Sequence, residues 1–250
     1  MKKSNRNGEI ATSCEGYEMK IIKYNNAHDI VVEFQDKYKT TVHAEYKEFK
    51  KGSICNPYHP SVCNIGYIGN TTMSINRKRK RSYVCWTNMI KRCCSNDKQK
   101  YPNYKDCKVC DEWLCYENFE KWWNNNYYEV DDEKMNLDKD ILIKNNKIYS
   151  PETCIIVPAR INMLFVSNKG IRGELPIGVY YDKIHSKYAV HCKINNIQKT
   201  IGYKDTLIEA FELYKITKEK EIKRVAEEYK NKIPKRLYDA MYNYEISISD

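Results

Sequence analysis

Apolar and polar residues alternate along the segment from about 177 to 204. The apolar positions at every second residue are Val179, Tyr181, Tyr188, Val190 and Cys192. A period of two is that of a β-strand with one buried face. Asn195 and Asn196 separate two such runs, and asparagine tolerates the positive φ of a tight turn. We therefore predict three short strands. Their opposite face would carry Tyr180, Asp182, Ala189, His191, Lys193, Gln198 and Thr200.

A helix is predicted directly after these strands. Thr206 and Glu209 have the spacing of a capping box, in which each side chain bonds the backbone N–H of the other residue. The apolar stripe that follows is Leu207, Ala210, Phe211, Leu213, Tyr214, Ile222, Val225, Ala226 and Tyr229. Its width is that of a helix packed against a sheet.

The N-terminal part of the chain also has the pattern of strands. Alternating residues are Ile30, Val32 and Phe34, and then Val42, Ala44 and Tyr46. They predict a small antiparallel sheet or barrel that ends at the turn residues 56–60. We interpret it as a positioning or nucleic-acid-binding module.

The middle of the chain, residues 82–166, combines helical and strand patterns. Two buried helix faces are indicated, one by Trp86, Met89 and Ile90 and one by Trp113, Phe119 and Trp122. A strand is then predicted over 137–142, a turn at 145–146, a second strand from 148 and a helix from 157. Strand, turn, strand and helix form the layout of a ββα-metal core, in which a hairpin and a helix hold one divalent cation.

Positive charge narrows the class of partner. Forty-three lysine and arginine residues face 33 aspartate and glutamate residues, so the formal net charge of the 250 residues is +10 at pH 7. This balance favours nucleic acid over an anionic membrane, and no apolar run is long enough for a transmembrane helix. The densest cationic run is Arg77, Lys78, Arg79, Lys80 and Arg81. It predicts a phosphate clamp, with a solvated loop as the alternative.

The eleven cysteines indicate a reducing compartment. The count is odd, and the first ten residues lack the apolar core of a secretory signal. We therefore expect reduced thiols in a cytoplasm, some of them able to bind metal.

Residues 173–230 resemble the ethylene-response-factor (APETALA-type) DNA-binding domain. The matching marks are Gly178-Val179, Lys187-Tyr188-Ala189, Ile201-Gly202, Thr206, Glu209-Ala210 and Tyr214. The resemblance implies a sheet that lies in the major groove of double-stranded DNA. The base-contacting positions that it implies are Tyr180, Asp182, His191, Lys193, Gln198 and Thr200. Lys193 is the one cation among these six, so a DNA sequence preference does not carry over.

The middle block resembles phage and mobile-element proteins of the HNH endonuclease class. The matching residues are Trp86, Met89, Arg92, Cys93, Cys110, Glu112, Trp113, Leu137, Asp138, Lys139, Tyr149, Ser150, Pro151, Glu152, Cys154 and Asn162. The resemblance implies a homing-like DNA endonuclease that uses Mg²⁺ or Mn²⁺ and acts in the cytoplasm of a bacterial host.

An α+β multidomain chain is the resulting prediction. It comprises a β module over 1–60, an HNH-like domain over 61–170, an APETALA-type domain over 171–233, and a tail or short helix over 234–250.

The implied nuclease site departs from its class at one position. Lys139 stands where active members carry the water-activating histidine, and lysine is a poor base near pH 7 unless it is strongly desolvated. Asp138 and Asp140 are the candidate Mg²⁺ ligands, and Asn162 would orient the metal or the phosphate. The five histidines all lie outside the middle block.

A structural zinc site is a second candidate. Cys107 and Cys110 have ligand spacing, and Cys93 and Cys154 fall at positions of the resemblance, so four thiolates could form a closed site. Buried cysteines without metal are the common alternative.

Two functions remain open from sequence. The leading one is an HNH-type endonuclease that hydrolyses DNA phosphodiester bonds with a divalent metal. The alternative is a nuclease-derived, sequence-specific DNA-binding protein or transcriptional regulator without catalysis, which the missing histidine favours.

Overall fold

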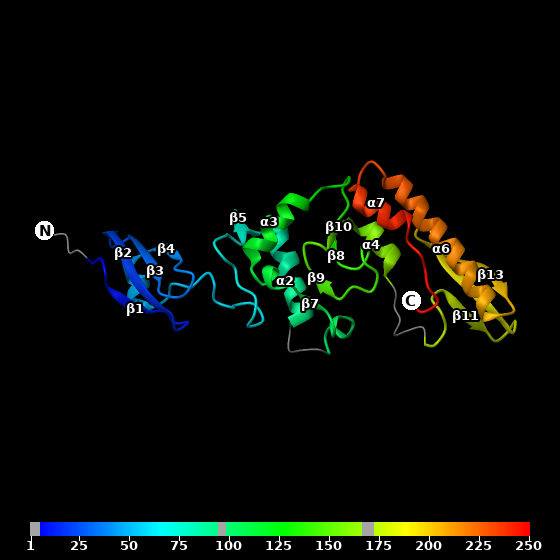
Figure 1. Ribbon diagram of the computed structural model, residues 1–250, viewed down its shortest axis with the longest axis horizontal. Coiled ribbons are helices and arrows are strands. Elements are labelled where there is room, and N and C mark those ends of the chain that lie inside the picture. Colours follow the sequence, from blue (N-terminus) through cyan, green and yellow to red (C-terminus); the bar gives the residue numbers. More distant parts are fainter. Residues whose placement is uncertain (1–5, 95–98, 167–172) are drawn as a thin grey trace. The chain divides into compact units, whose positions relative to one another are not determined.

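A computed structural model describes residues 6–94, 99–166 and 173–250 (Figure 1). The chain divides into two compact units, residues 1–125 and 126–250, and each is described by itself. None of the described helices is both long and apolar enough to cross a membrane.

The first unit begins with a four-stranded antiparallel sheet, as predicted, except that Tyr46, which the alternation placed in the last strand, is the first residue of a helix. Its strands are β1 (Ile10–Thr12), β2 (Glu18–Asn26), β3 (Asp29–Phe34) and β4 (Thr41–Ala44), paired in chain order. The alternating residues Ile30, Val32 and Phe34 are fully buried in its core. The short helix α1 (Tyr46–Lys51) ends at Gly52, whose φ is +67°. A Cβ there would lie 2.5 Å from the carbonyl oxygen of Thr12, so only glycine fits.

The rest of the first unit is mainly helical. The strands β5 (Ser74–Ile75) and β6 (Lys78–Arg79) form a hairpin, followed by α2 (Arg81–Cys94), η1 (Pro102–Tyr104), β7 (Lys108–Val109), η2 (Asp111–Leu114) and α3 (Tyr116–Asn126). Aromatic side chains fill the interior: Trp86, Trp113, Tyr116 and Phe119 are fully buried. The indole N–H of Trp86 donates to the carbonyl oxygen of Trp113 at 2.7 Å. The second predicted helix face is only partly right, because Trp113 lies on η2 rather than on α3, and on α3 Trp123 is buried whereas Trp122 is half-buried.

The second unit opens with a hairpin and a helix. The strands β8 (Met135–Asp138) and β10 (Ile155–Pro158) pair antiparallel, the two-residue strand β9 (Ile148–Tyr149) lies between them in sequence, and α4 (Ala159–Phe165) follows. The predicted strand over 137–142 is therefore too long, and the partner of β8 is not the strand at 148. β8 ends at Asp138 because one carboxylate oxygen of Asp138 accepts the backbone N–H groups of Asp140 and Ile141, both at 2.8 Å.

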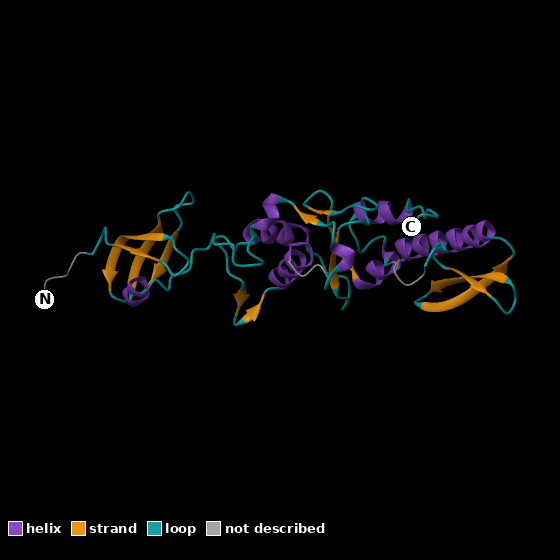
Figure 2. Ribbon diagram, turned by 90° about the horizontal axis from the view of Figure 1, so that it is seen from below, coloured by secondary structure: helices purple, strands orange, loops and turns teal. Residues whose placement is uncertain are grey.

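The predicted three-stranded sheet and long helix complete this unit. β11 (Val179–Asp182), β12 (Lys187–Ile194) and β13 (Ile197–Lys204) pair antiparallel in chain order, and α6 (Leu207–Tyr229) packs along them (Figure 2). The predicted capping box is present, since Thr206 accepts the N–H of Glu209 while the Glu209 side chain accepts that of Thr206. The short helix α7 (Lys235–Tyr242) follows.

One hydrophobic cluster runs through the second unit. It joins Val157 and Ile161 of the hairpin and helix to Val190 of the sheet, and it extends to Leu237 of α7. Within the described residues this core continues across positions 170 and 233, where the sequence analysis placed domain limits. The four-part division itself stays a prediction.

Candidate nucleic-acid interface

The six sheet positions that the resemblance implies lie on one face. Tyr180 is directly opposite Ala189, Asp182 is opposite Lys187, His191 is opposite Thr200, and Lys193 is opposite Gln198. Residues directly opposite each other on neighbouring strands share a face of the sheet. The intervening residues Val179, Val190 and Cys192 are buried on the α6 side. The six polar and aromatic side chains therefore project from the other side.

A bulge in β13 adds a tyrosine to this face. Val190 is opposite Gly202 and His191 is opposite Thr200, so Ile201 is an extra residue on β13. Such an insertion shifts the alternation by one position. As a result Tyr203, which is directly opposite Ala189, projects on the same side as Thr200. Strict alternation of buried and exposed residues does not reveal a bulge. For this reason the sequence analysis missed Tyr203.

The carboxylate of Asp182 bonds to residues of its own turn, so its oxygens are not free to contact a ligand on the face. One of its carboxylate oxygens accepts the backbone N–H groups of Ile184 and His185, and the other lies 2.7 Å from Nδ1 of His185. The bond with His185 lowers the pKa of Asp182. Asp182 thus shapes the turn between β11 and β12, and His185 was another residue that the sequence analysis did not single out.

Lysine dominates the charge of the three strands. Residues 179–204 contain five lysines, one aspartate and no glutamate. Lys193 is exposed near the end of β12, whereas Lys187 pairs with Asp205 at 3.0 Å. The sheet therefore has a positive margin suited to a polyanion.

The cationic run 77–81 forms a second basic surface, in the first unit. Asn76 and Arg77 have φ of 49° and 63° and make the tight turn of the β5–β6 hairpin, which leaves Arg77, Lys78 and Arg79 exposed. Lys80 differs, because its ammonium donates to Glu120 at 2.8 Å and its side chain is only 18% exposed. Lys80 therefore holds the hairpin to α3. The proposed phosphate contacts would be made by the exposed residues Arg77, Lys78 and Arg79.

The candidate catalytic residues lie in the loop after β8. The Lys139 ammonium donates to Asp140 Oδ2 at 2.7 Å and to the carbonyl oxygen of Asn146 at 3.0 Å. The Asn146 amide donates to the carbonyl oxygens of Lys139 and Ile148, at 2.7 and 2.6 Å, and so closes the loop. Burial, together with the neighbouring Asp140 charge, raises the pKa of Asp138 to about 6. The structure thus brings Asp138, Lys139 and Asp140 together.

The remaining predicted ligands belong to several elements of both units. Asn162 lies on α4, which packs against β8 and β10. Cys93, Cys107 and Cys110 belong to the first unit and Cys154 to the second. In the described ranges, no group of three or more histidine, cysteine, aspartate or glutamate side chains is placed to hold a metal ion. The zinc site stays a prediction.

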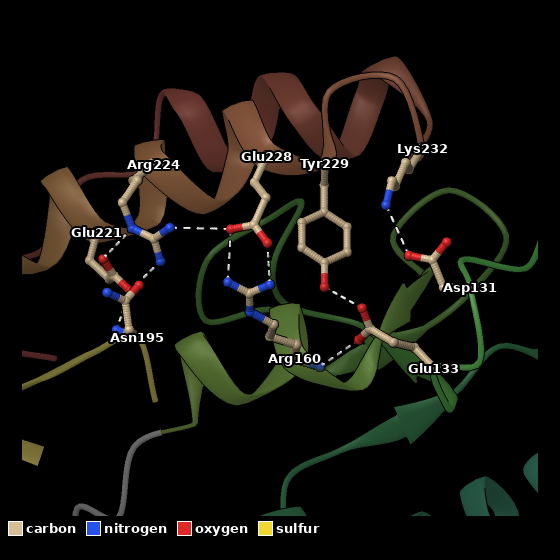
Figure 3. A network of polar contacts seen from close by, with 9 residues as sticks. All are labelled: Asp131, Glu133, Arg160, Asn195, Glu221, Arg224, Glu228, Tyr229 and Lys232. Atoms are coloured by element: carbon tan, nitrogen blue, oxygen red, sulfur yellow. Dashed lines mark hydrogen bonds and ion pairs between the residues drawn. The ribbon is translucent and has the colours of Figure 1, made fainter. Parts of the chain in front are cut away.

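A polar network links α6 to α4 and to the turn between β12 and β13 (Figure 3). The carboxylate of Glu228 pairs with the guanidinium groups of both Arg160 and Arg224. Arg224 continues to Glu221, whose carboxylate accepts the backbone N–H of Asn195 in the β12–β13 turn at 2.9 Å. The sheet turn, α6 and α4 are thereby linked in one chain of contacts.

The same helix also contacts the segment before β8. The hydroxyl of Tyr229 donates to Glu133, which also accepts the backbone N–H of Arg160 at 3.4 Å. Lys232, just beyond α6, pairs with Asp131 at 2.9 Å. These contacts tie the segment before β8 and the start of α4 to the C-terminal end of α6 inside the second unit.

Comparison with known proteins adds no assignment, because no protein-family model, curated protein or solved structure matches the chain.

Proposed function

We propose that this chain is a DNA-binding protein whose three-stranded sheet docks on duplex DNA. The observation that carries the proposal is the register of β11, β12 and β13, which gathers hydroxyl, amide, imidazole and ammonium groups on one face, where Lys193, Gln198 and Thr200 are exposed. Such groups bond to base edges and phosphates. The exposed hairpin at 74–79 would add sequence-independent phosphate contacts.

Lys193 gives the most direct test of the docking face. In fluorescence-anisotropy titrations of the full chain with duplex DNA, Lys193→Ala should weaken binding several-fold and reduce the salt slope by about one. The matched control is Lys199→Ala, because Lys199 is an exposed lysine of the same sheet whose opposite residue, Cys192, lies on the α6 side. Equal losses in the two variants would refute the assignment of the face.

Hydrolysis of DNA by an HNH-type site is a second candidate function. Two features support this candidate: the antiparallel pair of β8 and β10, which α4 follows, and the closeness of Asp138 to Asp140, whose charge raises the pKa of Asp138. Carboxylate oxygens are the donors that Mg²⁺ and Mn²⁺ prefer, so the two aspartates fit such a cation in chemistry. A bound cation would polarise the scissile phosphate.

Lys139 supports the alternative, a nuclease-derived protein that binds DNA without cutting it. Its ammonium sits on Asp140 and inside the loop, with only 8% of the residue exposed. A divalent cation would have to compete with this internal cation for Asp140. Lys139 is therefore a structural counter-charge in the position where the resemblance implies a base.

A nicking assay separates these candidates. Supercoiled plasmid is incubated with the full chain in Mg²⁺ or Mn²⁺, beside Asp140→Ala and the control Asp132→Ala, an exposed aspartate before β8. Nicking that is lost in Asp140→Ala alone supports the endonuclease. DNA binding without nicking in either metal supports the non-cleaving protein. A gain of nicking in Lys139→His would show that the missing histidine is what separates the two candidate functions.

The phage or mobile-element origin and the host cytoplasm belong to the same proposal and rest on the resemblance.

A further inference from the structure

An aromatic row crosses the exposed face of the C-terminal sheet. The row consists of Tyr180 on β11, Ala189 on β12 and Tyr203 on β13, which are directly opposite one another in register. The tyrosines are 47% and 46% exposed, while Ala189 between them is only 5% exposed. The two tyrosines and the small residue between them therefore form one apolar strip across three strands.

Each tyrosine of the row already lies against a histidine. The ring of His191 is 4.8 Å from that of Tyr180, and the ring of His185 is 5.4 Å from that of Tyr203, measured between centroids. These neighbours brace the rings and occupy part of the space around them. The strip therefore suits contact with small apolar groups better than insertion of flat, unpaired bases between ring faces.

Two lysines of β12 lie on either side of this strip, along the strand. Lys187 and Lys193 stand two residues before and four residues after Ala189, so they are about 20 Å apart along the strand. That reach exceeds the width of a DNA major groove, about 12 Å. Within the strip itself there is no charged residue. Lys193 on one side of the strip, and on the other side Lys187 once it exchanges Asp205 for a phosphate, match phosphates on both sides of a groove with base edges between them.

We infer that the aromatic row contacts the 5-methyl groups of thymine in the major groove, so that the chain prefers duplexes with thymine at the sites the row covers. The thymine methyl is the apolar group that the four bases present in that groove. Burying it against exposed ring carbon is favourable, whereas a sheet with arginines in these places would select hydrogen-bonding edges. This inference rests on the proposed DNA-binding function and specifies its substrate.

The test replaces thymine without changing the sequence. A duplex is first enriched from a random pool with the full chain, and it is then compared with the same duplex in which every thymine is deoxyuridine, which lacks only the methyl group. Anisotropy titrations should show about fourfold weaker binding to the uracil duplex for each methyl group contacted. Lys193→Ala should weaken binding to both duplexes equally, since it contacts no methyl group.

Variants of the row locate the effect. Tyr180→Ala and Tyr203→Ala should each reduce the difference between the two duplexes and the double variant should abolish it, whereas Tyr203→Phe, which keeps the ring, should keep the difference. The control is Tyr181→Ala, because Tyr181 is 49% exposed on the same strand but is opposite Tyr188 on the α6 side. The thymine–uracil comparison on the unaltered chain tests the methyl contact even where an alanine variant does not fold.

The outcomes distinguish this inference from the proposed function. Equal binding of thymine and uracil duplexes, or an enriched duplex without thymine, overturns the inference and leaves DNA binding standing. Failure to bind any duplex overturns the proposed function. Tighter binding to single strands than to duplexes, lost in Tyr180→Ala, would assign the row to base stacking and overturn the thymine contact.

Discussion

The loop after β8 and the exposed face of the C-terminal sheet use the same residue types in opposite ways. In the loop, the Lys139 ammonium, the Asp140 carboxylate and the Asn146 amide and carbonyl bond to one another and to the backbone. On the sheet, Lys193 is exposed, and so is Gln198, the residue directly opposite it on the neighbouring strand. Polar groups that satisfy each other stabilise a fold, and polar groups that face outward can meet a ligand. The sheet is therefore the stronger candidate for an interface.

The largest effect that tests this contrast is expected from Lys139→Ala. The change leaves the Asp140 carboxylate without its counter-charge and the Asn146 carbonyl without its donor, which should lower the free energy of unfolding by about 3 kcal/mol. Urea denaturation followed by far-UV circular dichroism measures it, since all four tryptophans lie in the other unit. The control Lys147→Ala, an exposed lysine of the same loop, should change stability by less than about 0.5 kcal/mol. Equal stabilities for the two variants would contradict a structural role for Lys139.

A smaller, pH-dependent effect is expected from Asp138→Asn. The folded pKa of about 6 lies above the ordinary value of 3.8, so the folded state binds this proton more tightly than the unfolded state does. The carboxyl group therefore lowers stability progressively as pH rises from about 4 to about 6, and the full cost persists above that range.

Asparagine keeps an oxygen to accept the two backbone N–H groups and carries no charge. The variant should be more stable than the natural chain by about 2 kcal/mol at pH 8 and no more stable near pH 4. Urea denaturation at both pH values gives the difference. A gain that does not change with pH would show that Asp138 does not carry the raised pKa.

The smallest expected effect concerns DNA binding by the hairpin of the first unit. Replacing Arg77, Lys78 and Arg79 with glutamine should flatten the plot of log binding constant against log salt by about two to three units. The comparison variant, Lys80→Gln, should instead lower thermal stability, because it removes the partner of Glu120. An unchanged salt slope in the triple variant would leave the hairpin without a role in binding.

The sequence predicted those parts of the fold that depend on neighbouring residues. Alternation located the N-terminal and C-terminal sheets, and the capping box at Thr206 located the start of α6. The pattern around 137–149 gave the wrong strand partner, because β8 pairs with β10, and the paired residues are 17 to 23 positions apart. The turn made by Asp138 is local, and the alternation did not reveal it.

The candidate site was predicted less completely than the fold. Six positions of the sheet face followed from alternation and resemblance, whereas Tyr203 depends on a bulge at Ile201 that no local pattern reveals. The buried state of Lys139 depends on Asn146, seven residues away, and the bond between Arg160 and Glu228 joins residues 68 positions apart. Contacts at such separations are properties of the folded chain.

Because Glu228 and Tyr229 near the end of α6 bind Arg160 and Glu133 outside the sheet segment, the sheet and its helix do not form an interchangeable cassette. A transplant of residues 177–229 into another protein would cut these bonds and expose the apolar residues of α6 that pack on Val157 and Ile161. A chimaera that keeps 126–250 intact would preserve them. Protein engineers who wish to borrow the proposed DNA-binding face should therefore move the whole second unit.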